Sequence, residues 1–411
     1  MKLSLFIATR IAFNKMQSFS RFIIRLSVAA TGLSVMAMIV TLSFVNGFQK
    51  EVSHKVFSFW GHIHVQHFEM GKSLVTEETP ITENDTILKL LQKEKAVHSI
   101  DAFATKSAVI EKNKSIEGIL IKGVERNFDS TRFIPFMKQG HWLRFYDTLF
   151  NKELLVSEQI ANTLEIKLGD TIRLHFISSK AGESSTYRKL IVSGIFKTGI
   201  EEYDNLFVIA DIRLLQRLNS WQKNQIGGYE ISLDDYTKLD SFNNTLLDKL
   251  PSEWASKTTK ELYPNIFDWL NIQDVNRNVV FIIMTIVAII NLITCLLVLV
   301  LERTKMIGLL KAIGLADIKI QQIFFFNAAI ITLIGIGSGL ILGLGLCWLQ
   351  ISTHFIQLDE SSYYVSYAPI YIIRWQVWLV CIGTSIICFL AVIIPTIVIK
   401  KLSPIKAIQF K

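Results

Sequence analysis

The sequence predicts an α-helical membrane protein with four transmembrane helices and a large extracytoplasmic α+β domain inserted between the first and second helices. Half of the 411 residues are hydrophobic and only 19% are charged, whereas soluble proteins carry about a quarter. Four apolar runs without a charge are long enough for a bilayer core, which needs about 20 helical residues. They cover residues 26–48, 279–301, 323–349 and 375–399.

The basic residues beside these runs predict the orientation. The segment before the first run has five basic and no acidic residues, the 302–322 loop has four basic and two acidic, and the tail from residue 400 has four basic and no acidic. These segments are expected in the cytoplasm, so both termini lie on that side. Because the basic excess borders the membrane, nucleic-acid binding is not needed to explain it. All four cysteines fall inside the runs, so no disulfide is expected in the outer domain.

The elements are expected in the following order. Residues 1–21 form a cytoplasmic interfacial helix, because apolar residues recur there at helical spacing. Residues 22–48 form the first transmembrane helix, and the helical pattern continues to Trp60 as a stalk. The extracytoplasmic α+β domain with its stalk helices covers 49–277. Within it, alternation at 63–67 predicts a strand, while 88–100 and 153–164 are expected to be helices.

A second stalk is expected at 264–278, leading into the second transmembrane helix at 278–301. Residues 302–321 form a short amphipathic cytoplasmic helix, with Met306, Leu309, Leu310 and Ile313 on one face. The third and fourth transmembrane helices cover 322–349 and 375–399, joined by an extracytoplasmic loop at 350–374. A cytoplasmic tail covers 400–411. Pro395 is expected to kink the last helix.

Glycines in the third transmembrane helix predict a helix-packing face. Gly335, Gly339 and Gly343 recur every four residues, and small residues at this spacing let helices approach closely. The sequence leaves open whether the partner helix belongs to the same subunit or to another.

The sequence contains few residues that resemble a catalytic or metal-binding motif. Gly71, Lys72 and Ser73 resemble the end of a phosphate loop, but the glycine-rich cradle is missing. His62 and His64 could share a strand face and hold one ion, with His67 on the opposite face, although a structural role is favoured. No hydrolase motif and no ionisable residue inside the four runs is present. We therefore expect no catalytic, cofactor-binding or metal-binding residues.

The loop after the second transmembrane helix carries a family resemblance. Glu302-Arg-Thr-Lys-Met-Ile-Gly-Leu-Leu-Lys-Ala-Ile-Gly314, together with one span, a large outer domain and three further spans, resembles the FtsX/MacB-type ABC permeases. The resemblance implies that this loop is the coupling helix that docks on a cytoplasmic ATPase. The coupling residues it implies are Glu302, Arg303, Lys305, Gly308, Lys311 and Gly314. The two glycines suit a close backbone approach or a helix end.

Segments of the outer domain are more similar to the lipoprotein-releasing LolC/LolE type. They are residues 118–124, 154–161, 168–170, 194–204 and 263–270. In the LolC type a protruding apolar hook recruits a periplasmic carrier, but the corresponding turn here, 178–186, is short and polar. This turn therefore departs from the carrier-recruiting hook of the LolC type.

The resemblance implies a non-enzymatic permease subunit of the bacterial inner membrane. It implies two copies of an ABC ATPase that bind ATP and Mg²⁺, a second permease subunit in a homo- or heterodimer, and a lipoprotein substrate or periplasmic partner. Two alternatives stay open: mechanotransmission for efflux or for cell-wall hydrolase regulation, and a membrane receptor with a ligand-binding outer domain.

Overall fold

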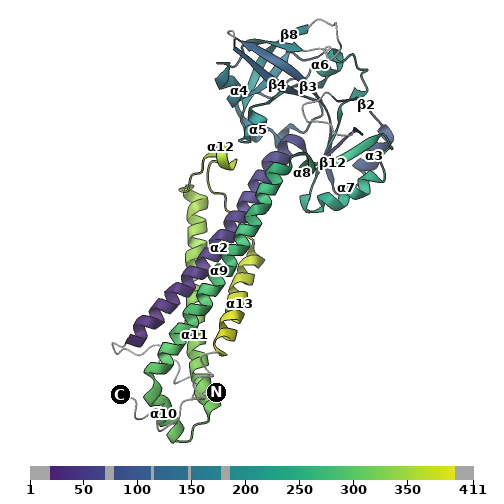
Figure 1. The fold of residues 1–411 in the computed structure, drawn as a ribbon. Coiled ribbons are helices and arrows are strands. Elements are labelled where there is room, and N and C mark those ends of the chain that lie inside the picture. Colours follow the sequence, from purple (N-terminus) through teal and green to yellow (C-terminus); the bar gives the residue numbers. More distant parts are fainter. Residues whose placement is uncertain (1–18, 70–77, 113–114, 147–149, 177–185, 394–411) are drawn as a thin grey trace. The chain divides into compact units, whose positions relative to one another are not determined.

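The computed structural model describes residues 19–69, 78–112, 115–146, 150–176 and 186–393. The chain divides into two units. One is a helix bundle drawn from residues 1–50, 269–357 and 367–411, and the other is an α/β unit drawn from 51–268 and 358–366. Figure 1 labels most helices and some strands of the two units.

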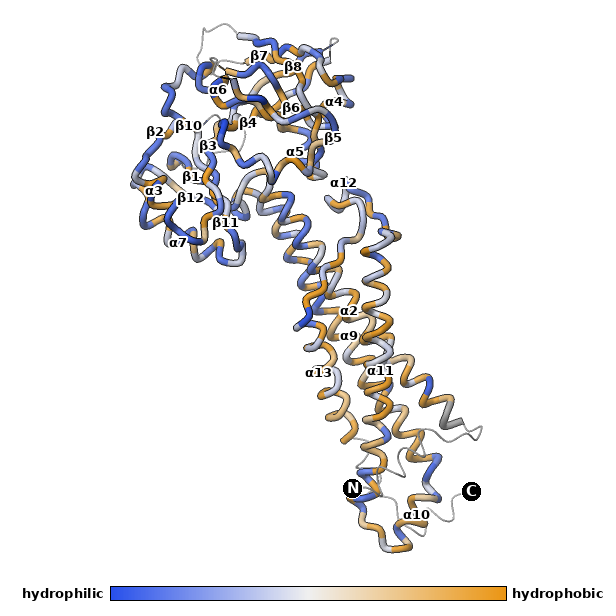
Figure 2. Tube along the Cα trace, turned by 180° about the vertical axis from the view of Figure 1, so that it is seen from behind, coloured by the Kyte–Doolittle hydropathy of each residue, from blue (hydrophilic) through white to orange (hydrophobic). Residues whose placement is uncertain are grey.

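The helix bundle contains four helices that are long and apolar enough to cross a membrane, among the residues that the structure describes. They are α2 (Phe19–Trp60), α9 (Pro264–Glu302), α11 (Asp317–Thr353) and α13 (Arg374–Ala391). Figure 2 shows that hydrophobic residues dominate α9, α11 and α13 over most of their length. Such helices satisfy their own backbone hydrogen bonds, which a bilayer core requires.

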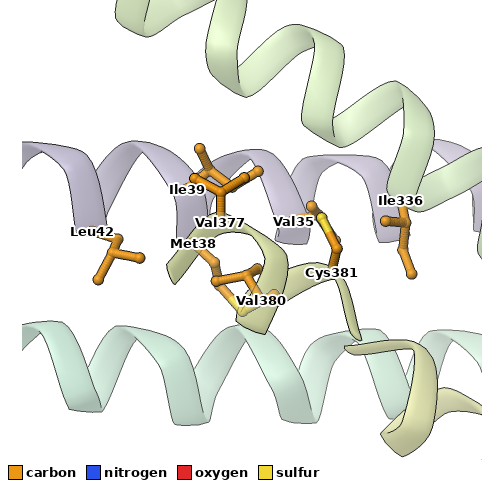
Figure 3. Close-up of a cluster of buried hydrophobic side chains, with 8 residues drawn as sticks. All are labelled: Val35, Met38, Ile39, Leu42, Ile336, Val377, Val380 and Cys381. Atoms are coloured by element: carbon orange, nitrogen blue, oxygen red, sulfur yellow. The ribbon is translucent and has the colours of Figure 1, made fainter. Parts of the chain in front are cut away.

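A buried cluster joins these helices in the bundle. Figure 3 shows Val35, Met38, Ile39 and Leu42 of α2 meeting Ile336 of α11 and Val377, Val380 and Cys381 of α13. Phe281 and Met284 of α9 pack against the same cluster. The four cysteines Cys295, Cys347, Cys381 and Cys388 are all buried and free, which is typical of small packing residues.

The helices α2 and α9 run side by side (Figure 1). The ring of Phe48 meets that of Trp269 edge-on at a centroid distance of 5.0 Å, and Gln49 donates to the carbonyl of Leu270. In the α/β unit, Phe57 of α2 packs against Phe267 of α9 at 5.6 Å. The expectation that residues 49–60 and 264–278 are helical is confirmed, since both lie within these continuous helices.

The described part of the α/β unit contains a ten-stranded sheet with the order β12-β1-β11-β3-β4-β9-β6-β8-β5. These strands are β1 (Ile63–His67), β3 (Val97–Lys112), β4 (Ser115–Val124), β5 (Met137–Gly140), β6 (Glu153–Ser157), β8 (Thr186–Phe196), β9 (Phe207–Asp211), β11 (Gly228–Leu233) and β12 (Trp254–Thr258). The tenth, β7 (Thr171–Phe176), pairs with both β3 and β8. This double pairing closes β3, β4, β9, β6, β8 and β7 into a ring around buried aliphatic side chains.

Short helices complete the α/β unit, together with a small pair of strands, β2 (Ile81–Thr82) and β10 (Gln225–Ile226). The helices are α3 (Asp85–Gln92), α4 (Glu158–Thr163), α5 (Glu201–Asp204), α6 (Ile212–Leu218), α7 (Leu239–Leu247) and α8 (Thr259–Leu262). Their starts follow local capping rules. Ser157 caps α4 by accepting from the backbone of Ile160, and Thr258 and Glu261 form a reciprocal capping box at α8.

Two secondary-structure predictions are wrong. Residues 88–100 are not one helix, because α3 ends at Gln92 and β3 begins at Val97. Residues 153–164 begin as the buried strand β6, and only 158–163 are helical. In both segments pairing with neighbouring strands overrides a local pattern that a helix fits equally well. The predicted interfacial helix, Pro395, the tail and most of the 178–186 turn lie outside the described residues.

Candidate coupling site

The loop after α9 folds into a separate short helix, α10 (Thr304–Ala312). Glu302 ends α9, and Arg303 leaves the helical backbone with φ −98° and ψ 14°. The Thr304 hydroxyl donates to the carbonyl of Leu301 at 2.7 Å. This bond satisfies one of the carbonyls that the end of α9 leaves without a helical partner.

Gly314 ends α10 by a backbone conformation that suits glycine. Its φ is +89°, a region that side chains with a Cβ rarely adopt. The Leu315 amide donates to the carbonyl of Leu310, and the Gly314 amide donates to that of Lys311. These two bonds form a Schellman motif, and Leu310 and Leu315 both pack against one buried cluster of the bundle. Gly314 therefore serves the helix end.

The inner face of α10 packs on the bundle. Ile307 is fully buried in a cluster with Leu299, Val300, Ile320 and Phe324. Met306 and Leu310 pack against this cluster, and Gly308 is buried. Of the four apolar residues predicted to share one face, Met306 and Leu310 pack against this cluster, whereas Leu309 and Ile313 are exposed. Packing against the bundle therefore covers only part of the predicted apolar face.

The outer face of α10 exposes apolar side chains. Leu309 is 57% exposed and Ile313 is 74% exposed, with Ile318 of α11 at 65%. Lys305 is exposed on the same short helix. Bulky aliphatic residues gathered on a helix between charged residues are typical of a protein contact surface.

The charged residues around α10 have different roles. Lys311 is largely buried and pairs with Asp317, the first residue of α11, at 3.0 Å. This pair ties the last turn of α10 to the start of α11, where an acidic residue favourably meets the helix dipole. Glu302 and Arg303 lie at the junction of α9 and α10. The six predicted coupling residues thus fall in one short segment, but only Lys305 lies on the outer face of α10 itself.

The predicted glycine face of α11 lies against α2 of the same chain. A Cβ on Gly339 would stand 2.5 Å from the carbonyl oxygen of Gly32, and one on Gly335 would stand 2.8 Å from Cβ of Thr31. A Cβ on Gly343 would stand 3.3 Å from Cβ of Ile39. Within the chain, these glycines therefore allow α11 to approach α2 closely.

A buried ion pair holds the last turn of α2 in the α/β unit. Lys122 of β4 donates to the carbonyl of Phe59, next to the end of α2, and its Nζ lies 2.6 Å from Oε1 of Glu230 in β11. Its ammonium also lies 4.3 Å from the ring centroid of Trp60. A cation is favourable at a helix C-terminus, where carbonyl oxygens gather.

Two further charges extend this cluster. Arg132 contacts Asp101 at 2.9 Å and Glu230 at 3.4 Å. Burial lowers the pKa of Lys122 to about 8, although Glu230 opposes this shift. Burial also raises the pKa of Asp101 against the effect of Arg132. The alternating charges explain how four ionisable side chains can be accommodated beneath α2.

The sequence itself carries a signal for this cluster. Lys122 is flanked by apolar or small residues in Gly118-Ile-Leu-Ile-Lys-Gly-Val124, and Glu230 lies in the apolar strand 229–233. A single charge inside a buried strand needs a partner. Opposite charges in two such strands are therefore candidates for a pair.

The histidines in β1 and directly before it have structural partners. His64 is buried, its Nε2 lies 2.9 Å from the carbonyl oxygen of Trp60, and burial lowers its pKa to about 3. His62 accepts a hydrogen bond from the amide of Leu233 at its Nδ1, and burial lowers its pKa to about 4. Nδ1 of His67 lies 3.1 Å from the carbonyl oxygen of Phe68. Within the described residues, no group of three His, Cys, Asp or Glu side chains is placed to hold a metal ion.

Comparison with known proteins assigns the chain to a class. The model of the MacB-like periplasmic core domain matches residues 26–248, more than half of the chain, and the model of the FtsX-like permease C-terminal domain matches residues 278–404. The chain therefore belongs to the FtsX/MacB-type family of ABC transporter permeases.

Individual relatives are similar over nearly the full length. The lipoprotein-releasing system transmembrane protein LolC of Neisseria meningitidis is 23% identical, covering 97% of this chain and 96% of the relative. LolE of Haemophilus influenzae is 25% identical, covering 94% of each. The crystal structure of the periplasmic region of MacB from Actinobacillus actinomycetemcomitans aligns at 14% identity with a TM-score of 0.35, covering 50% of this chain and 92% of that one.

Proposed function

We propose that this permease subunit couples ATP hydrolysis by a separate cytoplasmic ATPase to movement of its α/β unit outside the inner membrane. In this arrangement α2, α9, α11 and α13 span the membrane, the α/β domain is inserted between the first and second spans, and both termini are cytoplasmic. The distribution of basic residues supports this orientation.

The observation that carries the proposal is the exposed apolar face of α10. Leu309 and Ile313 project from a helix whose inner face is anchored by Ile307 and whose end is fixed by Gly314. A helix that is anchored on one face and apolar on the other can bind a partner protein and transfer the partner's displacement to the bundle. The ATPase is expected in two copies that bind ATP and Mg²⁺, with a second permease subunit completing a homo- or heterodimer.

Two continuous helices provide the path for transmission. α2 extends through residues of both units, and so does α9. At the end of α2, the Lys122 cluster fixes the last turn to β4 and β11. A displacement of α2 is therefore passed directly to the sheet of the α/β unit.

Docking can be tested by charging the outer face of α10. Ile313→Glu places a carboxylate on this face without touching the buried cluster, so we expect it to abolish co-purification of the ATPase. Ile116→Glu changes another largely exposed isoleucine, on β4, and is the matched control. Co-purification of the ATPase with the Ile313→Glu variant would contradict the proposal that the ATPase docks on the outer face of α10.

Release of lipoproteins from the inner membrane is the cargo we propose. It is supported by the full-length similarity to relatives named as lipoprotein-releasing system proteins, at 23% and 25% identity. Depletion of the protein should retain lipoproteins in the inner-membrane fraction. Unchanged lipoprotein distribution after depletion would rule out this cargo while leaving ATPase coupling intact.

Mechanotransmission for efflux or for cell-wall hydrolase regulation is the second candidate. The match of residues 26–248 to the MacB-like periplasmic core supports mechanotransmission as much as it supports lipoprotein release. Here the α/β unit would bind a periplasmic protein instead of a lipoprotein. Cross-linking followed by mass spectrometry separates the two, because the captured protein is either acylated cargo or a periplasmic partner.

A further inference from the structure

A loop between α11 and α13 packs with the α/β unit. Residues 358–366 belong to this unit, although the chain on both sides of them belongs to the bundle. The base of the loop is pinned by hydrogen bonds from Leu358 to Ser366 and from Ala368 to Ile356. At its tip lies the short helix α12 (Glu360–Tyr363), which Asp359 caps by accepting from the Ser361 amide.

Glu360 of α12 is held by two lysines from separate elements of the α/β unit. Its Oε2 lies 2.8 Å from Nζ of Lys197, which follows β8, and its Oε1 lies 3.5 Å from Nζ of Lys55 in α2. Lys55 also donates to the carbonyl of Tyr364 at 2.7 Å, and the Tyr364 hydroxyl donates to Glu202 of α5 at 2.8 Å. The carboxylate is thus the centre of a polar contact that joins the loop to α2, β8 and α5.

The α/β unit is shaped to receive this carboxylate. A Cβ on Gly199 would stand 2.4 Å from Oε1 of Glu360, and Gly199 has a φ of +76°. The buried Asp204 fixes this turn by accepting from the amides of Thr198 and Gly199, both at 2.9 Å. Gly199 and Asp204 therefore shape the site that receives Glu360. We call this site, formed by Lys55, Lys197 and the turn at Gly199, the socket.

The contact between the loop and the α/β unit contains a short ion pair but buries little apolar surface. Burial opposes ionisation of Glu360, yet Lys197 and Lys55 hold its pKa below the usual range. Val365 is the apolar side chain of the loop that is buried, and the other contacts are polar and partly open to solvent. An open cavity of about 270 Å³, lined by Asn162, Glu201 and Ser361 among others, adjoins the socket. Partly exposed ion pairs contribute little net free energy, so such a contact can open readily.

We propose that the loop is a releasable latch, in which Glu360 occupies the socket between Lys55 and Lys197 at rest and leaves it when the α/β unit moves. This inference rests on the proposed function, because the ATPase supplies the movement. It gives the 194–204 segment a role as the socket of this latch.

The closed state can be tested without the ATPase. In the full chain in lipid nanodiscs, Glu360→Gln should speed chymotrypsin cleavage after Tyr363 and Tyr364 by about threefold or more, because cleavage follows the open population. Glu201→Gln removes an equal charge from the wall of the same cavity and should leave the rate unchanged. Equal rates in parent and Glu360→Gln would overturn the latch.

Release can be tested by locking the loop. Ser361→Cys combined with Asn162→Cys places thiols beside one cavity, and the natural cysteines are buried. A reducible bismaleimide across this pair should abolish ATP-driven lipoprotein release by the permease–ATPase complex, and reduction should restore it. Full activity of the locked complex would show that the loop never leaves its socket. If the complex without the cross-link shows no ATP-driven lipoprotein release, the proposed function fails, and with it the proposal that the loop leaves its socket. The proteolysis experiment still tests whether Glu360 holds the loop closed.

Discussion

Nζ of Lys122 lies 2.6 Å from Oε1 of Glu230, and both side chains are buried beneath the last turn of α2. This ion pair joins neither adjacent residues nor adjacent strands, since β11 and β4 are separated by β3. The Lys122 ammonium also donates a hydrogen bond to the carbonyl of Phe59. The end of α2 is therefore fixed to the sheet by charge as well as by aromatic packing.

The first prediction concerns this pair. Lys122→Met should destabilise the α/β unit by about 3–5 kcal/mol, because it leaves a buried carboxylate with weaker compensation. Hydrogen exchange of the β4 and β11 amides in the full chain measures the loss. Adding Glu230→Gln should recover part of the stability. Simple additivity of the two changes would mean that the charges do not interact.

The second prediction concerns the contact of α11 with α2. Gly339→Ala should lower bundle stability by about 1–3 kcal/mol, because its methyl group overlaps the Gly32 backbone. Gly337→Ala is the matched control two residues away, where a Cβ meets nothing within 4 Å. It should be neutral or stabilise by up to about 1 kcal/mol through helix propensity. Thermal unfolding in detergent compares the two, and equal melting temperatures would refute the packing face.

The third prediction concerns Glu125, which follows β4 and lines an open cleft of about 1400 Å³. Burial, with a further contribution from Glu83, raises its pKa from 4.5 to about 7. Because the folded state binds the proton more tightly, this group lowers stability as pH rises from about 4.5 to 7, and the loss persists above that range. Glu125→Gln removes the loss and should stabilise the protein by about 2–3 kcal/mol at pH 8.

The pH profile of thermal unfolding tests the third prediction. The advantage of Glu125→Gln over the parent should shrink as pH falls from 8 to 5, because the parent carboxyl becomes neutral. Glu117→Gln, at an exposed position on β4, serves as control. A pH-independent advantage would show that ionisation of Glu125 is not its cause.

The sequence allowed much of the helical framework to be predicted, because long apolar runs and the continued periodicity to Trp60 are local features. It did not reveal the strand at 97–100 or the strand at 153–157, since both depend on pairing with distant segments. The interpretation of Gly314 as a possible helix end agrees with its φ of +89°. Which apolar residues of α10 are buried could not be predicted from periodicity, because Ile307 and Ile313 are equally apolar and only packing against the bundle buries Ile307.

Contacts between distant charges were also beyond the sequence analysis. In the sequence Glu360 is one charge in a loop between two apolar runs, whereas in the structure it lies between Lys55 and Lys197. Any two of these three residues are more than 140 positions apart in the sequence, so no local spacing pattern could predict their contact. The turn at Gly199 that admits the carboxylate depends on Asp204 and on the surrounding fold.

The most direct test of the central claim is photo-cross-linking from α10 in living cells. A photoreactive amino acid replacing Ile313 should capture a protein with an ATP-binding Walker motif, identified by mass spectrometry, whereas the same amino acid at Ile116 should not. This result would place the exposed face of α10 against the ATPase. Capture of no ATPase from Ile313, with the protein present at its normal level in the membrane, would contradict the account.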